Sequence, residues 1–214
     1  MALFLVQSAP MAVQTEQSPT VFIVDDDATI RFAMQALMDS VNLHHEIFAS
    51  GDEFLEKMTD QRPGCLVLDI RMPGLGGLEL QEELIKRGNT LPIIFITGHG
   101  DVPMAVEAMQ KGAVDFIQKP FRDQELLDRI RDALATDEER REAQQHHAEV
   151  AGRLDRLTNR EREVFDLVVT GKPNKVIAYE LGVSQRTVEI HRARVMEKMQ
   201  ARSLADLVKM HMTA

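Results

Sequence analysis

The 214-residue sequence contains little cysteine and no long apolar run. Its single cysteine, Cys65, can form no internal disulfide, which excludes a disulfide-stapled secreted fold and favours a reducing compartment. No segment approaches the ~18 consecutive apolar residues of a membrane span, so we expect no membrane partner and a cytoplasmic location. The apolar start of the chain lacks the basic flank of a signal peptide. We interpret residues 1–18 as a disordered leader, or as an upstream start ahead of Met11.

Positive charge is also scarce, because the chain has 25 basic and 34 acidic residues and a formal net charge of −9. The imbalance is uneven: residues 1–155 contain 14 basic and 27 acidic side chains, whereas residues 156–214 contain 11 and 7. The hydrophobic content of 44% suffices for two small packed cores. An acidic first part and a basic second part indicate two domains, the second suited to a polyanion.

Apolar runs of strand character alternate with patterns of helical period in the first part of the chain. The sequence predicts strands at residues 20–24, 45–48, 65–68, 93–96 and 114–117. Predicted helices follow them at residues 28–40, 50–58, 77–87, 102–111 and 123–134. Five such units in a row predict an α/β fold with a doubly wound, five-stranded parallel sheet covered by helices on both faces.

The character of the sequence changes after residue 134. Thr136 and Glu139 have the spacing of a capping box, and the following residues are almost wholly polar. We interpret residues 136–153 as a solvated helical linker that can continue the preceding helix and can pair between protomers, with an ordinary flexible connector as the alternative. Residues 154–214 predict a small all-α domain, in which helices at 174–181 and 184–200 meet at a tight turn containing Gly182. Two helices joined in this way are typical of a helix-turn-helix.

Polar side chains follow four of the predicted strands: Asp25, Asp26, Asp69, Thr97 and Lys119. In a parallel sheet these side chains emerge at one edge, beyond the carboxyl ends of the strands, where open α/β sheets place their sites. Three carboxylates crowded together repel one another, and an oxygen-preferring cation such as Mg²⁺ relieves that repulsion. The sequence therefore predicts a site for phosphate chemistry with a metal.

The motifs at residues 24–27, 68–74, 95–98 and 118–121 resemble, in order and spacing, the receiver domain of two-component response regulators. Residues 96–109 resemble the FixJ type of that family. Segments 157–161, 174–178 and 184–191 resemble the LuxR-type DNA-binding domain. The resemblance covers the chain from about Thr20 to its C-terminus. It implies a flavodoxin-like receiver at residues 19–135 and a helix-turn-helix domain at 154–214.

The resemblance implies a role for each residue at the sheet edge. Asp69 would accept a phosphoryl group from a sensor histidine kinase, and Asp26, Asp69 and the main-chain carbonyl of Arg71 would bind Mg²⁺, with Asp25 acting partly through water. Lys119 would pair with the phosphoryl group, and the peptide bond before Pro120 would be cis; a trans turn proline is the alternative. The chain would be a phosphoacceptor with at most slow self-dephosphorylation, and not an enzyme.

Switching would begin at Thr97, whose hydroxyl donates to the phosphoryl group, and would let Phe116 turn inward. Without the resemblance, Phe116 is equally well interpreted as an ordinary core residue. The surface formed by residues 102–111 and the following strand and helix would then form a homodimer on phosphorylation.

The third helix of the C-terminal domain would enter the major groove of double-stranded promoter DNA. Base-facing positions by resemblance are Glu189, Ile190 and Ala193, although a solvated glutamate is an alternative for Glu189. Val188, Val195 and Met199 are assigned to the core. Candidates for phosphate contacts or groove lining are Lys175, Ser184, Arg186, Thr187, His191, Arg192, Arg194 and Lys198, with packing as the alternative for His191.

These features together predict a phosphorylation-activated transcriptional regulator, an activator by resemblance, with RNA polymerase as a further partner. A haloacid dehalogenase phosphatase also forms an aspartyl phosphate, but its Asp-x-Asp motif is missing, because Asp69 is followed by Ile70 and Arg71. A receiver that only passes phosphate or binds proteins is the other alternative, and the helix-turn-helix pattern argues against it.

Overall fold

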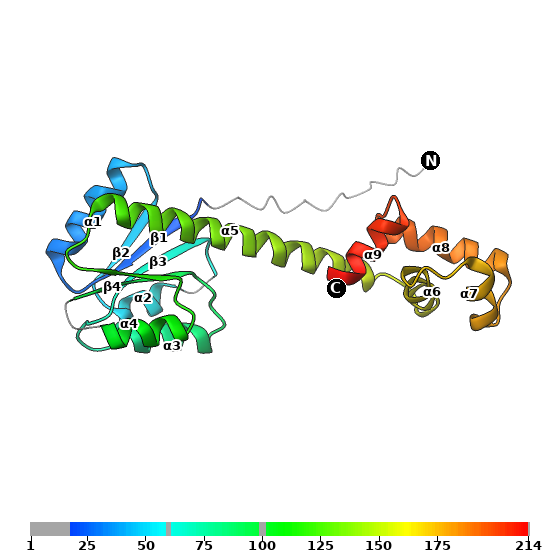
Figure 1. Cartoon of the computed structure of the whole chain (residues 1–214), viewed down its shortest axis with the longest axis horizontal. Coiled ribbons are helices and arrows are strands. Elements are labelled where there is room, and N and C mark those ends of the chain that lie inside the picture. Colours follow the sequence, from blue (N-terminus) through cyan, green and yellow to red (C-terminus); the bar gives the residue numbers. More distant parts are fainter. Residues whose placement is uncertain (1–17, 59–60, 99–101, 214) are drawn as a thin grey trace, which may run out of the picture. The chain divides into compact units, whose positions relative to one another are not determined.

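A computed structural model of the chain describes residues 18–58, 61–98 and 102–213. The chain divides into two compact units, Met1–Glu138 and Glu139–Ala214. The first unit contains a parallel sheet with the strand order β2-β1-β3-β4-β5 (Figure 1). Its strands are β1 (Thr20–Val24), β2 (His45–Phe48), β3 (Gly64–Asp69), β4 (Ile93–Thr97) and β5 (Asp115–Gln118). This order places β3 at the centre of the sheet with β1 next to it, and both strands end at an acidic motif.

Helices cover both faces of this sheet, as the alternating pattern predicts. On one face α1 (Ala28–Ser40) and the first part of α5 (Asp123–Leu154) pack against strand residues such as Ile23, Val67 and Ile94. On the other face α2 (Gly51–Lys57), α3 (Gly77–Lys86) and α4 (Val102–Gln110) pack against Phe22 and its neighbours (Figure 1). Successive strand residues point to opposite faces, so β1 to β4 contribute to both cores, whereas the edge strand β5 adds Ile117 to the first of them. The predicted doubly wound α/β fold is confirmed.

Helix α5 continues from the receiver into the linker, which is one of the interpretations of the sequence, but it differs from the prediction at Thr136. The helix runs without interruption through this residue, and the Thr136 hydroxyl donates a hydrogen bond to the carbonyl of Asp132 (2.9 Å). The predicted capping box at Thr136 is therefore wrong, since no helix begins there. Asp137 is buried, and its carboxylate accepts a hydrogen bond from the N–H of Gly64 at the start of β3 (2.9 Å). Residues 142–149 of the same helix are exposed.

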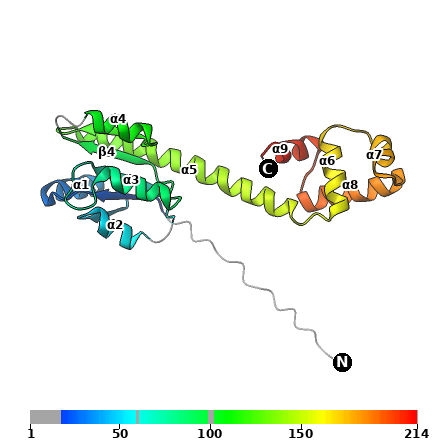
Figure 2. The same cartoon turned by 90° about the horizontal axis from the view of Figure 1, so that it is seen from below.

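The second unit is a group of helices with a core of its own (Figure 2). Its helices are α6 (Asn159–Val169), α7 (Asn174–Leu181), α8 (Gln185–Met199) and α9 (Leu204–Thr213). Val164, Phe165 and Val188 lie at the centre of this core, and the last turns of α5 add Val150 and Leu154 to it. A capping box between Thr158 and Glu161 opens α6. Within the described residues, no helix has the length and apolar character that crossing a membrane requires.

Candidate functional site

Asp69 is the last residue of the central strand β3, and a glycine fixes the path of the chain around it. The N–H of Gly77, the first residue of α3, donates a hydrogen bond to the carbonyl of Ile70 (3.0 Å). A Cβ atom at Gly77 would lie 2.3 Å from the main-chain oxygen of Asp69 and 3.1 Å from a ring carbon of Phe95. Any side chain there would force strand and helix apart, so Gly77 holds α3 against the carboxyl end of β3.

Three carboxylates meet at this edge of the sheet. Asp25 follows β1, and one carboxylate oxygen from each of Asp25, Asp26 and Asp69 can be chosen so that all three lie within 4.8 Å of one another. Asp25 and Asp69 are buried, whereas Asp26 is exposed. An all-oxygen set of this kind, open to solvent on one side, suits a hard divalent cation that keeps some of its waters. These residues therefore fit Mg²⁺.

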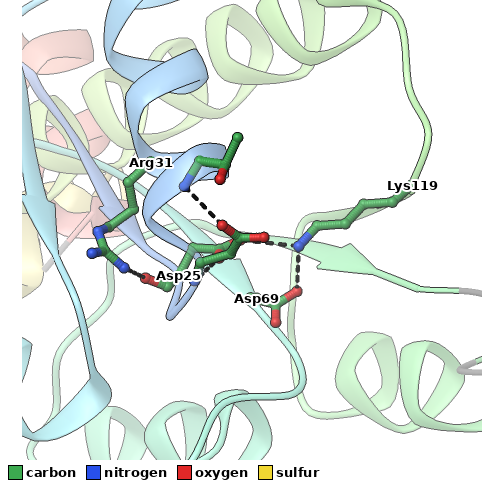
Figure 3. Close-up of polar contacts among 6 residues, drawn as sticks. Asp25, Arg31, Asp69 and Lys119 are labelled. Carbon is green, nitrogen blue, oxygen red and sulfur yellow. Dashed lines mark hydrogen bonds and ion pairs between the residues drawn. The ribbon is translucent and has the colours of Figure 1, made fainter.

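Lys119 enters the same group from the end of β5 (Figure 3). Its ammonium donates to Asp25 Oδ2 (3.0 Å) and to Asp69 Oδ1 (2.9 Å). The peptide bond between Lys119 and Pro120 is cis, as the resemblance implied. The N–H of Lys119 donates to the carbonyl of Thr97 (2.7 Å), which ties β5 to β4 beside the site. One ammonium thus donates hydrogen bonds to two of the three carboxylates.

Burial and the neighbouring charges change the pKa values of Asp69 and Lys119. Burial raises the pKa of Asp69 above its ordinary value; the hydrogen bond and charge of Lys119 oppose this, and the charges of Asp25 and Asp26 add to it. Burial works against the charged form of Lys119, but its hydrogen bonds to Asp69 and Asp25 outweigh that effect, so the pKa of Lys119 is raised. The site therefore holds a firmly protonated lysine next to a destabilised carboxylate.

The backbone that carries Asp25 is held from three directions. Its carboxylate accepts a hydrogen bond from the N–H of Asp27 (2.8 Å), and its main-chain oxygen accepts one from Nη1 of Arg31 on α1 (2.7 Å; Figure 3). Its N–H donates to the carbonyl of Phe48 in β2 (3.3 Å). Sequence reasoning did not identify Arg31, and the only signal for it is an arginine in the second turn of the helix that follows the acidic loop.

The structure also places the remaining residues predicted for switching. Thr97 is buried at the end of β4, and its hydroxyl donates to the carbonyl of Gly98 (3.0 Å). Arg71 lies in the loop after β3 with an exposed side chain. The side chain of Phe116 in the edge strand β5 is 40% exposed and so does not belong to the core. It lies in the same α4–β5 region as Val106 (49% exposed), Met109 (38%) and Val114 (37%).

Helices α7 and α8 of the second unit form a helix-turn-helix. Gly182 closes α7 with a positive φ of 65°, a conformation that glycine adopts without strain. Ser184 then caps α8, because its hydroxyl oxygen accepts a hydrogen bond from the N–H of Thr187 (3.1 Å). Val188, Val195 and Met199 are buried on the inner side of α8, as predicted.

The outer side of α8 carries the residues predicted to face DNA bases. Glu189, Ile190 and Ala193 are exposed, and so are the predicted phosphate contacts Arg186 and Arg194. Arg186 lies 3.6 Å from Glu189 in an exposed ion pair. Lys175 is exposed in the first turn of α7. This stripe offers both cationic groups for phosphates and an apolar side chain for a base edge.

Other predicted DNA contacts are engaged inside the domain. The ammonium of Lys198 bonds to the buried carboxylate of Glu161 (2.5 Å) and to the carbonyl of Arg156 (3.0 Å), so it joins α8 to the start of α6. Arg192 Nη1 donates to the side chain of Asn174 at the start of α7 (3.0 Å). The Nδ1 atom of His191 is buried and has no hydrogen-bond partner in the described part of the chain.

Both parts of the chain match known families. Residues 21–131 match the response regulator receiver domain, and residues 155–211 match the LuxR family of bacterial regulatory proteins. The chain is 50% identical over 193 residues to Nodulation protein W of Bradyrhizobium diazoefficiens, across 90% of this chain and 85% of that protein. It is 44% identical over 198 residues to the transcriptional regulatory protein FixJ of Azorhizobium caulinodans, across 92% and 94%.

A solved structure resembles the chain as a whole. The response regulator StyR has a TM-score of 0.85 and 44% identity, and the match covers 92% of this chain and 100% of that one. The receiver fold, the helix-turn-helix and the relatives agree with the resemblance stated from the sequence. The chain belongs to the transcriptional response regulators of two-component systems, with a receiver domain followed by a LuxR-type DNA-binding domain.

Proposed function

We propose that Asp69 is the phosphoacceptor of this regulator and that a sensor histidine kinase phosphorylates it. The observation that carries the proposal is the position of Lys119, whose ammonium lies within hydrogen-bond distance of both Asp25 and Asp69. A cation placed beside a buried carboxylate at the carboxyl end of a central strand is suited to bind the oxygens of a transferred phosphoryl group. Asp25 and Asp26, which follow β1, lie beside Asp69 and are the other two carboxylates that could bind a metal.

In the proposed reaction, a carboxylate oxygen of Asp69 attacks the phosphorus of a phosphohistidine on the kinase. The O–P bond forms as the N–P bond breaks, and the imidazole nitrogen leaves with the bonding electrons and takes a proton from solvent. Lys119 stays ion-paired throughout, moving one of its donors from the Asp69 carboxylate to a phosphoryl oxygen. The raised pKa of Asp69 marks a carboxylate whose charge is poorly compensated. The acyl phosphate would bring further negative charge to the site, which Lys119 and a bound cation would offset.

Asp26, Asp69 and the main-chain carbonyl of Arg71 are the groups that we propose to hold Mg²⁺, with Asp25 acting partly through water. When bound, Mg²⁺ would neutralise negative charge on the transferred oxygens and help to align the attacking and leaving groups. The protein residues do the rest. Burial of Asp25 and Asp69 limits access of water to the acceptor, and Gly77 keeps the Asp69 main chain in place.

Phosphorylation would act through Thr97 and Phe116. The Thr97 hydroxyl now bonds to the adjacent carbonyl of Gly98, and it would turn to the phosphoryl group, which offers a stronger, charged acceptor. The half-exposed ring of Phe116 would then turn inward and change the α4–β5 surface. Val106, Met109 and Val114 give this surface apolar side chains for a second copy of the chain.

The output would be dimeric binding of paired half-sites in promoter DNA through α8, followed by activation with RNA polymerase as a partner. A regulator that binds the chromosome acts in the cytoplasm of a bacterium, and this supports the proposed location. The chain would turn over no substrate beyond slow loss of its own phosphoryl group. The exposed Arg186, Ile190 and Arg194 on α8 are the residues that support DNA contact most directly.

The Asp69→Asn variant tests the phosphoacceptor. Incubation with acetyl phosphate and Mg²⁺ should add one phosphoryl group to the wild-type chain and none to Asp69→Asn, as measured by intact mass spectrometry. Asp115→Asn is the matched control, because Asp115 pairs with Arg129 on the surface away from the acidic cluster (2.9 Å). Labelling of Asp69→Asn at the wild-type level would overturn the assignment.

A DNA-binding measurement on the same full-length proteins tests the output. Phosphorylated wild-type protein should bind its own promoter DNA more tightly than untreated protein, and the affinity should fall as salt rises. Asp69→Asn should show no such gain with acetyl phosphate. Equal affinity of the treated and untreated wild-type chains would separate DNA binding from phosphorylation and refute the regulatory part of the proposal.

A further inference from the structure

Arg31 lies beside the acidic cluster but bonds to a main-chain oxygen there instead of to a carboxylate. Its Nη1 donates to the main-chain oxygen of Asp25 (2.7 Å; Figure 3), and in the described part of the chain it forms no ion pair with a carboxylate. Side chains on a helix lean toward its N-terminus. Arg31, in the second turn of α1, therefore reaches back over the helix start to the loop that carries the carboxylates.

This hydrogen bond fixes the orientation of one peptide group. The peptide unit is planar, so holding the carbonyl of Asp25 also sets the direction of the N–H and Cα of Asp26. The N–H of Asp25 is held on the strand side by the carbonyl of Phe48 (3.3 Å). The link between Asp25 and Asp26 is thus clamped by Arg31 at the point where the chain leaves the sheet.

Asp26 depends on that clamp more than its neighbours do. The Asp25 carboxylate is held directly, by the N–H of Asp27 and by the ammonium of Lys119. The Asp69 carboxylate is also held by Lys119. The exposed carboxylate of Asp26 has no hydrogen-bond partner among the described residues, so only its backbone determines where it points.

We propose that Arg31 is a positioning residue that sets the direction of Asp26 for a divalent cation. This inference rests on the proposed Mg²⁺ site. Two effects of Arg31 on cation binding have opposite signs, which makes the inference testable. As a nearby positive charge, Arg31 repels a cation, and its removal alone would tighten Mg²⁺ binding. As a clamp on the backbone of Asp26, its removal weakens Mg²⁺ binding.

The experiment is calorimetric titration of the full-length chain with MgCl₂. We expect Arg31→Met to bind Mg²⁺ about tenfold more weakly than the wild type, the lower end of what loss of a supporting hydrogen bond costs a metal site. Arg31→Lys keeps the charge but shortens the reach, and we expect an affinity between those two. Arg87→Met is the control, because it removes the same charge from an exposed arginine paired with Glu83 on α3 and should leave Mg²⁺ affinity unchanged.

The Asp26→Asn variant separates a failure of the proposed Mg²⁺ site from a failure of the proposed role of Arg31. If Asp26→Asn binds Mg²⁺ as the wild type does, the proposed metal site itself is wrong. If Asp26→Asn binds weakly but Arg31→Met binds as tightly as the wild type or more tightly, Arg31 acts only as a charge and this inference is refuted. Should Arg31→Met fail to fold by circular dichroism, Arg31→Lys decides: weaker binding supports the clamp, and wild-type binding refutes it.

Discussion

Lys198→Met should destabilise the C-terminal domain, although the sequence suggests that Lys198 is a DNA contact. The side chain of Glu161 is 3% exposed, and the ammonium of Lys198 is its main partner. The hydrogen bond from Lys198, followed by that from the N–H of Thr158, lowers the pKa of Glu161 from its ordinary 4.5 to about 2. That difference corresponds to about 3 kcal/mol of folding free energy at neutral pH.

The loss expected for Lys198→Met is smaller than this total. The Thr158 hydrogen bonds remain in the variant, and the Lys198 side chain is 33% exposed, so water replaces part of the lost interaction. We therefore expect a destabilisation of about 2 kcal/mol, below the ~3 to 5 kcal/mol that removal of one partner from a fully buried pair costs. A lowered carboxylate pKa stabilises the fold above pH 4.5, and this contribution disappears as the pH falls toward 2. The difference between wild type and variant should shrink over that range.

Urea unfolding of the full-length chain measures this effect in one domain. The chain has no tryptophan, and its single tyrosine, Tyr179 on α7, is 87% exposed in the folded domain, so hydrogen exchange of the α6 and α8 amides at each urea concentration is used to report the C-terminal domain alone. At about 1 kcal/mol per molar urea for a small domain, the midpoint should fall by about 2 M. Lys175→Met, at an exposed position, should leave the midpoint unchanged and weaken DNA binding. A wild-type midpoint for Lys198→Met, together with a smaller salt dependence of DNA binding, would refute this reasoning.

Three further predictions concern the receiver. Gly77→Ala should lower its melting temperature and slow phosphorylation by acetyl phosphate, because the added methyl group collides with the main chain of Asp69. In metal-free buffer, thermal melts should show Asp69→Asn gaining stability over the wild type as the pH rises, because a raised pKa means that ionising Asp69 costs folding energy; Mg²⁺ should remove the gap. Val106→Glu should weaken phosphorylation-dependent dimerisation in analytical ultracentrifugation, whereas Ile85→Glu, equally exposed on α3, should not.

Each of these predictions has an outcome that contradicts it. A wild-type melting temperature for Gly77→Ala would mean that α3 can move away from β3 at little cost. A pH-independent difference between Asp69→Asn and the wild type would show that the Asp69 carboxylate is ordinary in the folded state. Equal dimerisation of the Val106→Glu and wild-type proteins would remove the α4–β5 surface from the proposed interface.

The sequence predicted the elements whose signals are local. The strand at residues 20–24 and the helix at 174–181 have the bounds that the structure gives them. An apolar run defines the strand, and Pro173 and Gly182 mark the two ends of the helix. The carboxylates and Lys119 could be grouped as well, since parallel strands bring their carboxyl ends to one edge whatever lies between them.

What could not be predicted depends on partners distant in the sequence. Lys198 looks like a phosphate contact on a basic helix, but Glu161, its partner, lies 37 positions earlier in another helix. Asp137 belongs to a polar run that suggests full solvation, yet packing of α5 brings it to the N–H of Gly64, 73 positions away. Arg31 bonds to a main-chain atom, and no side-chain pattern reveals such a contact.

The contribution of α5 to the second core determines which fragment of the chain can fold alone. The LuxR family match begins at residue 155, but Val150 and Leu154 are already buried against Phe165 and the helices around it. A DNA-binding fragment cut at the family boundary would lose both side chains and leave an open apolar surface. A fragment beginning one or two helical turns before Val150 would keep that surface closed.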